Sequence, residues 1–162
     1  MNLATLLPPF VADDSPDLEV TIPGHPVGAS RPTVTCYGAH YSRSHVQWER
    51  VAVQVVALTW RGRAPMEGPV SVEIEIVQRR PRSLCRRKDP PHRIPACCKP
   101  DIDNVAKLVL DALTKARIWR DDTQVCELSA RKWYAAIEPD EAERVVVRGK
   151  AQDAWTQRRA GR

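Results

Sequence analysis

The sequence predicts a small single domain of the α/β (α+β) class, with one mixed β-sheet and two principal helices. The chain has 162 residues, a length that fits one domain. Its hydrophobic content of 43% and charged content of 28% are ordinary globular values, so a disordered chain and a membrane protein are both excluded. Segments with strand and helix periodicity follow one another as strand, helix, strand, helix, strand, strand, which is typical of one mixed sheet.

Four segments carry the pattern of β-strands. Residues 18–22 alternate apolar and polar side chains before Pro23-Gly24, and residues 70–77 alternate strictly, with Val70, Val72, Ile74 and Ile76 on one side. Two further strands are expected over residues 123–134 and 143–148. A shorter β-like stretch is expected around residues 33–36.

Two segments carry helical periodicity. Ser44 is the expected N-cap of the first, which covers residues 45–60. Its expected core face consists of Trp48, Val51, Ala52, Val55 and Leu58. The many β-branched residues leave a strand open as an alternative for part of it. The second helix is expected over residues 102–115.

The second helix separates a core face from a polar face. The apolar positions are Ile102, Val105, Ala106, Val109 and Leu113. The polar positions are Asp103, Lys107, Asp111 and Thr114. Trp119, just after this helix, is expected to pack in the core, with stacking on a DNA base as the alternative.

The positive charge of the chain is concentrated in one segment. The net charge is +5, yet residues 79–99 contain eight Lys and Arg residues against one acid. We expect an exposed basic loop that contacts DNA phosphates; a solubilising disordered loop is the alternative. The candidate DNA-binding residues are Arg79, Arg80, Arg82, Arg86, Arg87, Lys88, Arg93 and Lys99.

The remaining composition bears on domain limits and location. We expect a flexible N-terminal segment over residues 1–17, the folded domain over 18–150 and a tail over 151–162. The first residues lack a basic signal-peptide start and no long apolar run occurs, so a cytoplasmic protein is expected. Five cysteines without a C-x-x-C pair predict free thiols. The histidines lack metal-ligand spacing and are expected in loops or at the surface.

Four aspartates flank the second helix. Asp101 and Asp103 straddle its expected start, and Asp121-Asp122 would open the next strand. Because successive strand residues point to opposite faces, only one of the latter pair could join the first two. Three converging carboxylates would suit Mg²⁺, which selects oxygen ligands. The alternative is helix capping, with an ordinary ion pair between Asp103 and Lys107.

The run KPDIDNVAKLVLDALTKARIWRDDTQV over residues 99–125 closely resembles the signature of the RusA family of Holliday-junction resolvases. The similarity is strong over residues 99–134, where D-x-D-N-x-x-K, D-A-L, W-x-D-D and Q-V occur in order, and weaker but collinear over 18–78. Two features depart from the family pattern. The basic loop is long, and Arg117 stands where a glycine would ease a left-handed helix end.

The resemblance implies a homodimeric endodeoxyribonuclease, common in phages and prophages, that nicks two opposed strands of a four-way DNA junction. It implies that Asp101, Asp103 and Asp122 are the metal-binding catalytic aspartates and that Lys107 is the catalytic lysine. Asp121 and Asp111 are second-tier candidates. The implied cofactor is Mg²⁺, with Mn²⁺ as an alternative ion, and the implied chemistry is phosphodiester hydrolysis that leaves a 5′-phosphate.

Two other functions remain open from the sequence. One is a relaxed endonuclease that cuts branched DNA and flaps as readily as junctions. The other is a non-catalytic junction-binding protein, in which the aspartates only cap and pair. The clustered aspartates argue against a non-catalytic binding protein, because negative charge beside DNA does not contribute to binding its phosphates.

Overall fold

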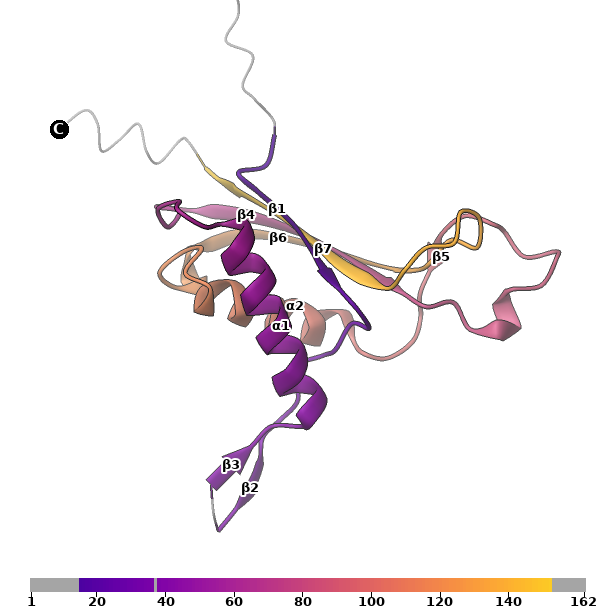
Figure 1. Ribbon diagram of the computed structural model, residues 1–162, viewed down its shortest axis with the longest axis horizontal. Coiled ribbons are helices and arrows are strands. Elements are labelled where there is room, and N and C mark those ends of the chain that lie inside the picture. The colour runs from indigo at the N-terminus through magenta and orange to yellow at the C-terminus, as the bar shows by residue number, and fades with distance from the viewer. Residues whose placement is uncertain (1–14, 37, 153–162) are drawn as a thin grey trace, which may run out of the picture.

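A five-stranded mixed sheet forms the centre of the molecule (Figure 1). The computed structural model describes residues 15–36 and 38–152. The strand order is β1-β7-β4-β6-β5, and the strands are β1 Leu18–Pro23, β4 Val70–Gln78, β5 Ile94–Pro95, β6 Val125–Tyr134 and β7 Arg144–Ala151. The predicted fold class is therefore confirmed. Residues 1–14 and 153–162, most of the two predicted terminal segments, lie outside the described residues.

The sheet is mixed because one of its neighbouring pairs is parallel. β4 pairs with β6 in parallel, whereas β1–β7, β4–β7 and β5–β6 are antiparallel. A parallel pair needs a long crossover connection, and here it is supplied by residues 79–124, which contain the basic segment and the second helix. Every residue proposed from the sequence for metal binding or catalysis lies in this one connection.

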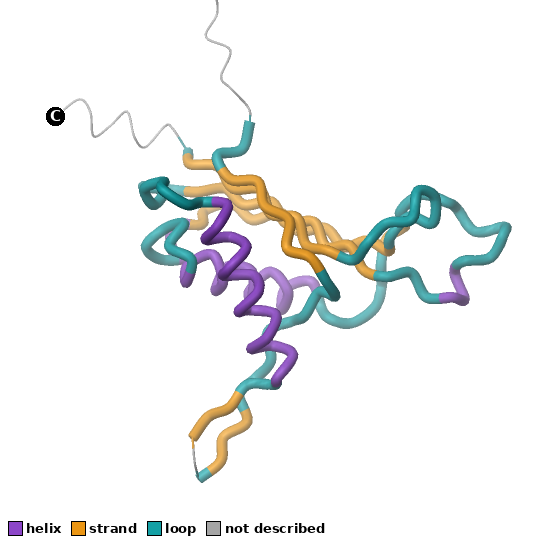
Figure 2. Tube along the Cα trace, in the orientation of Figure 1, coloured by secondary structure: helices purple, strands orange, loops and turns teal. Residues whose placement is uncertain are grey.

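Both helices pack on the same face of the sheet (Figure 2). They are α1 Arg43–Thr59 and α2 Ile102–Lys115. The four apolar side chains predicted for β4 are buried beneath them, as are Leu18, Val20 and Ile22 of β1. No helix among the described residues has the length and apolar character to cross a lipid bilayer.

Helix α1 begins slightly earlier than the sequence suggested. Its N-cap is Ser42, not Ser44, and the Ser42 hydroxyl accepts a hydrogen bond from the His45 amide at 3.3 Å. His45 consequently lies in the first turn, buried and stacked on Tyr41. The expectation that every histidine lies in a loop or at the surface was therefore wrong for this one.

The buried face of α1 also differs in detail from the prediction. Trp48 and Ala52 are buried as expected, and Val56 joins them. Leu58 is 70% exposed instead. The helical spacing that runs through Trp48, Ala52 and Val56 turns Leu58 away from the sheet.

Helix α2 has the predicted limits, and its end shows the predicted departure. Arg117 has a φ of 60°. The Ile118 amide donates to the Leu113 carbonyl at 3.1 Å, and the Arg117 amide donates to the Thr114 carbonyl at 3.0 Å. These two bonds are the Schellman pattern, in which glycine is the usual left-handed residue.

Trp119 packs in the core, as predicted. Its ring is 1% exposed and its indole nitrogen donates to the Thr114 hydroxyl at 2.7 Å. Asp121 and Asp122, in contrast, do not open a strand as expected. A short 3₁₀ turn, Asp122–Gln124, separates them from β6.

A β-hairpin formed by β2 Thr33–Thr35 and β3 Gly38–His40 projects from the body of the molecule ahead of α1 (Figure 1). Val34 on β2 is 78% exposed. The short strand expected around residues 33–36 is thus one half of this hairpin.

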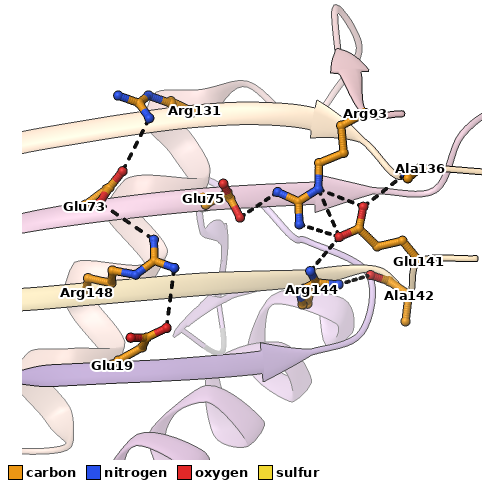
Figure 3. Close-up of polar contacts among 10 residues, drawn as sticks. All are labelled: Glu19, Glu73, Glu75, Arg93, Arg131, Ala136, Glu141, Ala142, Arg144 and Arg148. Carbon is orange, nitrogen blue, oxygen red and sulfur yellow. Dashed lines mark hydrogen bonds and ion pairs between the residues drawn. The ribbon is translucent and has the colours of Figure 1, made fainter. Parts of the chain in front are cut away.

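A line of alternating charges crosses the sheet face that the helices leave uncovered (Figure 3). Arg131 on β6 pairs with Glu73 on β4 at 3.6 Å, and Glu73 pairs with Arg148 on β7 at 3.7 Å. Arg148 in turn pairs with Glu19 on β1 at 3.4 Å. We call these four residues the charge ladder; it ends with a positive charge on β6.

Candidate active site

Two carboxylates lie at the N-terminus of α2 without a hydrogen-bonding or ion-pair partner among the described residues. Asp101 is the N-cap residue, but its side chain makes no capping hydrogen bond, and Asp103 lies in the first turn. Both side chains are exposed. Within the described part of the chain neither carboxylate takes part in a hydrogen bond or ion pair. Capping, the alternative from the sequence, therefore does not account for them.

Lys107 is similarly uncommitted. It follows Asp103 by one helical turn, yet the two form no ion pair within the described residues, and the Lys107 side chain is exposed. It lines a groove of about 320 Å³ together with Arg31, Asp111 and Lys115. Lys115 is paired with Glu49 at 2.5 Å, so the cations of this groove that remain available to an anion are Arg31 and Lys107.

The chain entering α2 is fixed by residues that the sequence did not single out. Lys132 on β6 donates from its ammonium group to the Pro100 carbonyl at 2.9 Å and also to the Cys98 carbonyl. The Gln78 side-chain amide donates to the Lys99 carbonyl at 3.3 Å. The sequence did contain a signal for Lys132. The alternation of β6 places it on the sheet face that the helices cover, which is an unusual position for a lysine.

A close backbone approach holds the other side of this entry. A Cβ atom on Gly28 would lie 3.0 Å from the Pro100 Cβ and 3.1 Å from the Asn104 Cβ. The neighbouring Ala29 amide donates to the Asn104 carbonyl at 2.8 Å. Glycine is needed at position 28 because any side chain would push the loop away from the start of α2.

Asp101 and Asp103 open onto a broad cleft of about 1050 Å³, which we call the carboxylate cleft. Lys99, Ala130, Arg131 and Lys132 also line it. The cleft therefore combines oxygen ligands suited to a hard cation with basic groups suited to phosphate.

Asp122 does not join this pair within one chain. It follows the C-terminus of α2, whereas Asp101 and Asp103 lie at the N-terminus. A helix of 14 residues is about 20 Å long. Among the described residues, no group of three or more His, Cys, Asp or Glu side chains could hold one metal ion. Within one chain, therefore, the three aspartates do not converge, because α2 lies between Asp122 and the other two.

Asp121 and Asp111 occupy different settings. The Asp121 carboxylate accepts from the Thr123 amide at 2.9 Å. Hydrogen bonds from the Thr123 side chain and backbone lower the pKa of Asp121, and burial opposes them weakly. This hydrogen bond caps the short 3₁₀ turn, so the Asp121 carboxylate has a local structural role. Asp111 lies midway along α2 beside Lys107, in the groove.

The basic segment is more structured than expected, and two of its arginines are not exposed. Arg80 is buried and donates to the Ala135 carbonyl at 3.0 Å, the Pro90 carbonyl at 2.6 Å and the His92 carbonyl. Arg93 pairs with Glu75 at 2.8 Å and with Glu141. A count of charged residues cannot reveal this structural role. A guanidinium has several N–H donors, so one arginine can bind several backbone carbonyls and hold a loop in place.

Five basic side chains of this segment remain exposed and free of ion pairs within the described residues. They are Arg79, Arg82, Arg87, Lys88 and Lys99. Arg86 is exposed as well, but it pairs with Asp89 at 3.2 Å. The segment also contains a short 3₁₀ turn, Arg82–Leu84, and β5. It is thus a shaped basic surface, and its last cation, Lys99, lines the carboxylate cleft.

Comparison with known proteins agrees with this arrangement. The family model of endodeoxyribonuclease RusA matches residues 23–148. The chain is also 29% identical over 126 residues to the uncharacterized protein YqaN of Bacillus subtilis (strain 168), an alignment that covers 73% of this chain and 88% of that protein. The nucleases of the matched family act on branched DNA and generally depend on divalent metal ions. The chain belongs to the RusA family of endodeoxyribonucleases.

Proposed function

We propose that this protein is a Mg²⁺-dependent, structure-selective endonuclease that resolves Holliday junctions by paired symmetric nicks, in DNA recombination and repair. The observation that carries the proposal is the pair of exposed, uncommitted carboxylates at the start of α2. The helix dipole favours an acid in the first turn, such as Asp103, but two adjacent carboxylates without a hydrogen-bonding partner also form a donor pair suited to a divalent cation.

The donor set at this position fits a divalent ion. Mg²⁺ is commonly held by one or two carboxylates, with water and substrate phosphate completing its coordination. Asp101 and Asp103 supply such a pair in the open carboxylate cleft. They are the residues that would hold the ion, with Mn²⁺ as an alternative. When bound, the ion supplies Lewis-acid activation of water and of the phosphate.

The protein's own residues bind and orient the DNA strand. The exposed cations Arg79, Arg82, Arg87, Lys88 and Lys99 attract the phosphate backbone. Lys107 faces a phosphate oxygen and stabilises the negative charge that develops during hydrolysis. Water attacks phosphorus, the bond to the 3′-oxygen breaks, and the products carry a 3′-hydroxyl and a 5′-phosphate.

A homodimer accounts for the position of Asp122. In one chain α2 separates Asp122 from the other two aspartates. In a dimer with two-fold symmetry, Asp122 of the partner subunit would complete each site. The same symmetry presents two sites to a four-way junction, which is itself nearly two-fold symmetric, and therefore favours paired cuts.

Cleavage of defined DNA structures tests the proposal. The purified protein is incubated with a four-way junction, a duplex of the same sequence and a fork, each with and without Mg²⁺. We expect paired nicks in the junction, dependent on the metal and abolished in Asp101→Asn and Asp122→Asn. Asp140→Asn is the matched control, because Asp140 is equally exposed but lies in the turn before β7.

Each alternative function predicts a different result. Equal cleavage of forks and junctions would indicate a relaxed branched-DNA endonuclease. Tight junction binding that falls with salt, without cleavage under any divalent metal, would indicate a non-catalytic binding protein and refute the proposal.

A further inference from the structure

We propose that the open edge of β6 is the dimer interface, and that two copies of the chain join there as antiparallel strands centred on Ser129. The inference rests on the homodimer of the proposed function and identifies the surface that forms it. Three observations carry it: an unpaired strand edge, a self-complementary sequence along that edge, and the charge ladder that ends there.

The outer edge of β6 is open over most of its length. β5 pairs only with Trp133 and Tyr134, and the Ala96 amide donates to the Lys132 carbonyl at 3.1 Å. From Val125 to Arg131, no described strand lies beside this edge. Such an edge presents a row of unpaired amides and carbonyls that favours the addition of another strand.

The backbone direction fixes which residues can pair across this edge. The Lys132 carbonyl points outward to Ala96, whereas the Ala135 amide points inward to the Gln78 carbonyl at 2.7 Å. The direction of the backbone amide and carbonyl groups alternates from residue to residue along a strand. The backbone groups of Leu128 and Ala130 therefore also point outward, away from β4. A two-fold axis at Ser129 places Leu128 opposite Ala130 of the partner subunit, as a hydrogen-bonded pair in each direction.

The side chains are complementary in this register. The segment Glu127-Leu128-Ser129-Ala130-Arg131 sets Glu127 opposite Arg131 of the partner subunit, in a non-hydrogen-bonded pair where side chains approach closely. Leu128 is 46% exposed and Ile102, on the same face, is 37% exposed. Pairing of the two chains would cover apolar surface that the monomer leaves in water.

The charge ladder supports the same partner. It alternates Glu19, Arg148, Glu73 and Arg131 from β1 to β6 (Figure 3), and the partner's Glu127 continues the alternation. The other outer strand, β1, carries Glu19 as its only charged residue, so two copies of that edge would oppose no complementary charges.

The pairing also bears on the carboxylate cleft. Ala130 and Arg131 line that cleft, and an antiparallel partner strand would lie beside them as far as the partner's Glu127, opposite Arg131. Beyond Arg131 the edge is occupied by β5 and Ala96, so the partner's chain leaves the sheet there. This point is close to the start of α2, because Lys132 donates to the Pro100 carbonyl directly before Asp101. The partner's Asp122, five residues before the partner's Glu127, would therefore approach Asp101 and Asp103.

A charge-reversal cycle tests the interface. The mass of the full-length protein is measured by sedimentation equilibrium, for the unchanged chain, for Glu127→Arg, for Arg131→Glu and for the double variant. Each single change sets like charges opposite each other at both symmetric positions, so we expect the dimer dissociation constant to rise about tenfold or more. The double variant restores opposite charges and should return to within about threefold.

The controls separate interface effects from effects on folding. Glu19→Arg changes an acid on the same face of the other outer strand and should leave dimerisation unchanged. Circular dichroism checks that each variant is folded. Arg131→Glu also breaks the pair with Glu73, but the double variant carries the same change, so its recovery cannot arise within one chain.

Two results would overturn the inference. One is a protein that remains monomeric at about 100 µM, far above the dissociation constants of specific dimers. The other is a dimer that the single reversals leave unchanged, or that the double reversal fails to restore. Because the readout is mass, a normal cycle together with uncut junctions would instead refute the proposed function and leave this interface standing.

Discussion

Replacement of Glu141 by glutamine tests the cluster that anchors the basic segment to the sheet. Glu141 accepts from the Arg93 guanidinium at 2.8 Å and from the Ala136 amide at 3.0 Å, and it pairs with Arg144 of β7 (Figure 3). Its side chain is only 10% exposed. Glu141→Gln keeps the shape of this side chain and removes its charge.

The magnitude follows from the pKa of this carboxyl. The hydrogen bond from Arg93 chiefly lowers the pKa of Glu141 from its usual 4.5 to about 2, although burial opposes the change. At 1.36 kcal/mol per pKa unit, the carboxylate contributes about 3 kcal/mol to folding at neutral pH. Because the folded-state pKa is lowered, this contribution is present above pH 4.5 and is lost as the pH falls toward 2.

Urea unfolding at several pH values measures the effect. At pH 7 we expect Glu141→Gln to lower the unfolding free energy by about 2–3 kcal/mol. The charged Arg93 would lose one of its two acidic partners and retain the ion pair with Glu75. The difference from the unchanged chain should shrink between pH 4.5 and 2.5. The exposed Glu138 serves as control in Glu138→Gln. A difference below about 0.5 kcal/mol at pH 7, or one independent of pH, would refute the reasoning.

Three further variants test other features. Arg117→Gly should raise the unfolding free energy by about 1 kcal/mol, because glycine adopts the left-handed conformation without steric cost; Arg117→Ala, measured alongside by urea unfolding, should bring no gain. Gly28→Ala should destabilise by about 1–3 kcal/mol through its contact with Pro100, and unchanged stability would contradict the close approach. Lys132→Met leaves the Pro100 carbonyl without its donor and should cost about 1–2 kcal/mol together with slower junction cleavage. Unfolding and cleavage that both match the unchanged chain would show that Lys132 does not position this loop.

The sequence predicted the sheet and helices well where periodicity was strong. Residues 70–77 and 102–115 were placed almost to the residue, because strict alternation and a wide apolar stripe each admit one conformation. The cap of α1 was misplaced by two positions, since Ser42 and Ser44 are equally good N-cap residues. Local pattern does not choose between two such neighbours.

The candidate site was predicted less completely. The sequence proposed Asp101, Asp103 and Lys107 as site residues, and all three side chains are exposed. Spacing could not reveal that Asp122 lies beyond the far end of α2, because proximity in the sequence does not give distance across a helix. The burial of Arg80 and the ion pairs of Arg93 were equally hidden, since both depend on carbonyls and acids from distant segments.

The crossover between β4 and β6 has a consequence for how this protein can change. Both of its ends are held by strand pairing, and Arg80 and Arg93 fasten the basic segment near its base. The stretch between them can therefore gain or lose residues without moving the sheet or α2, and each doubling of its length costs only about 0.6 kcal/mol in chain entropy. An insertion or deletion there would reshape the basic segment while leaving Asp101, Asp103 and Lys107, the residues of the proposed site, in place.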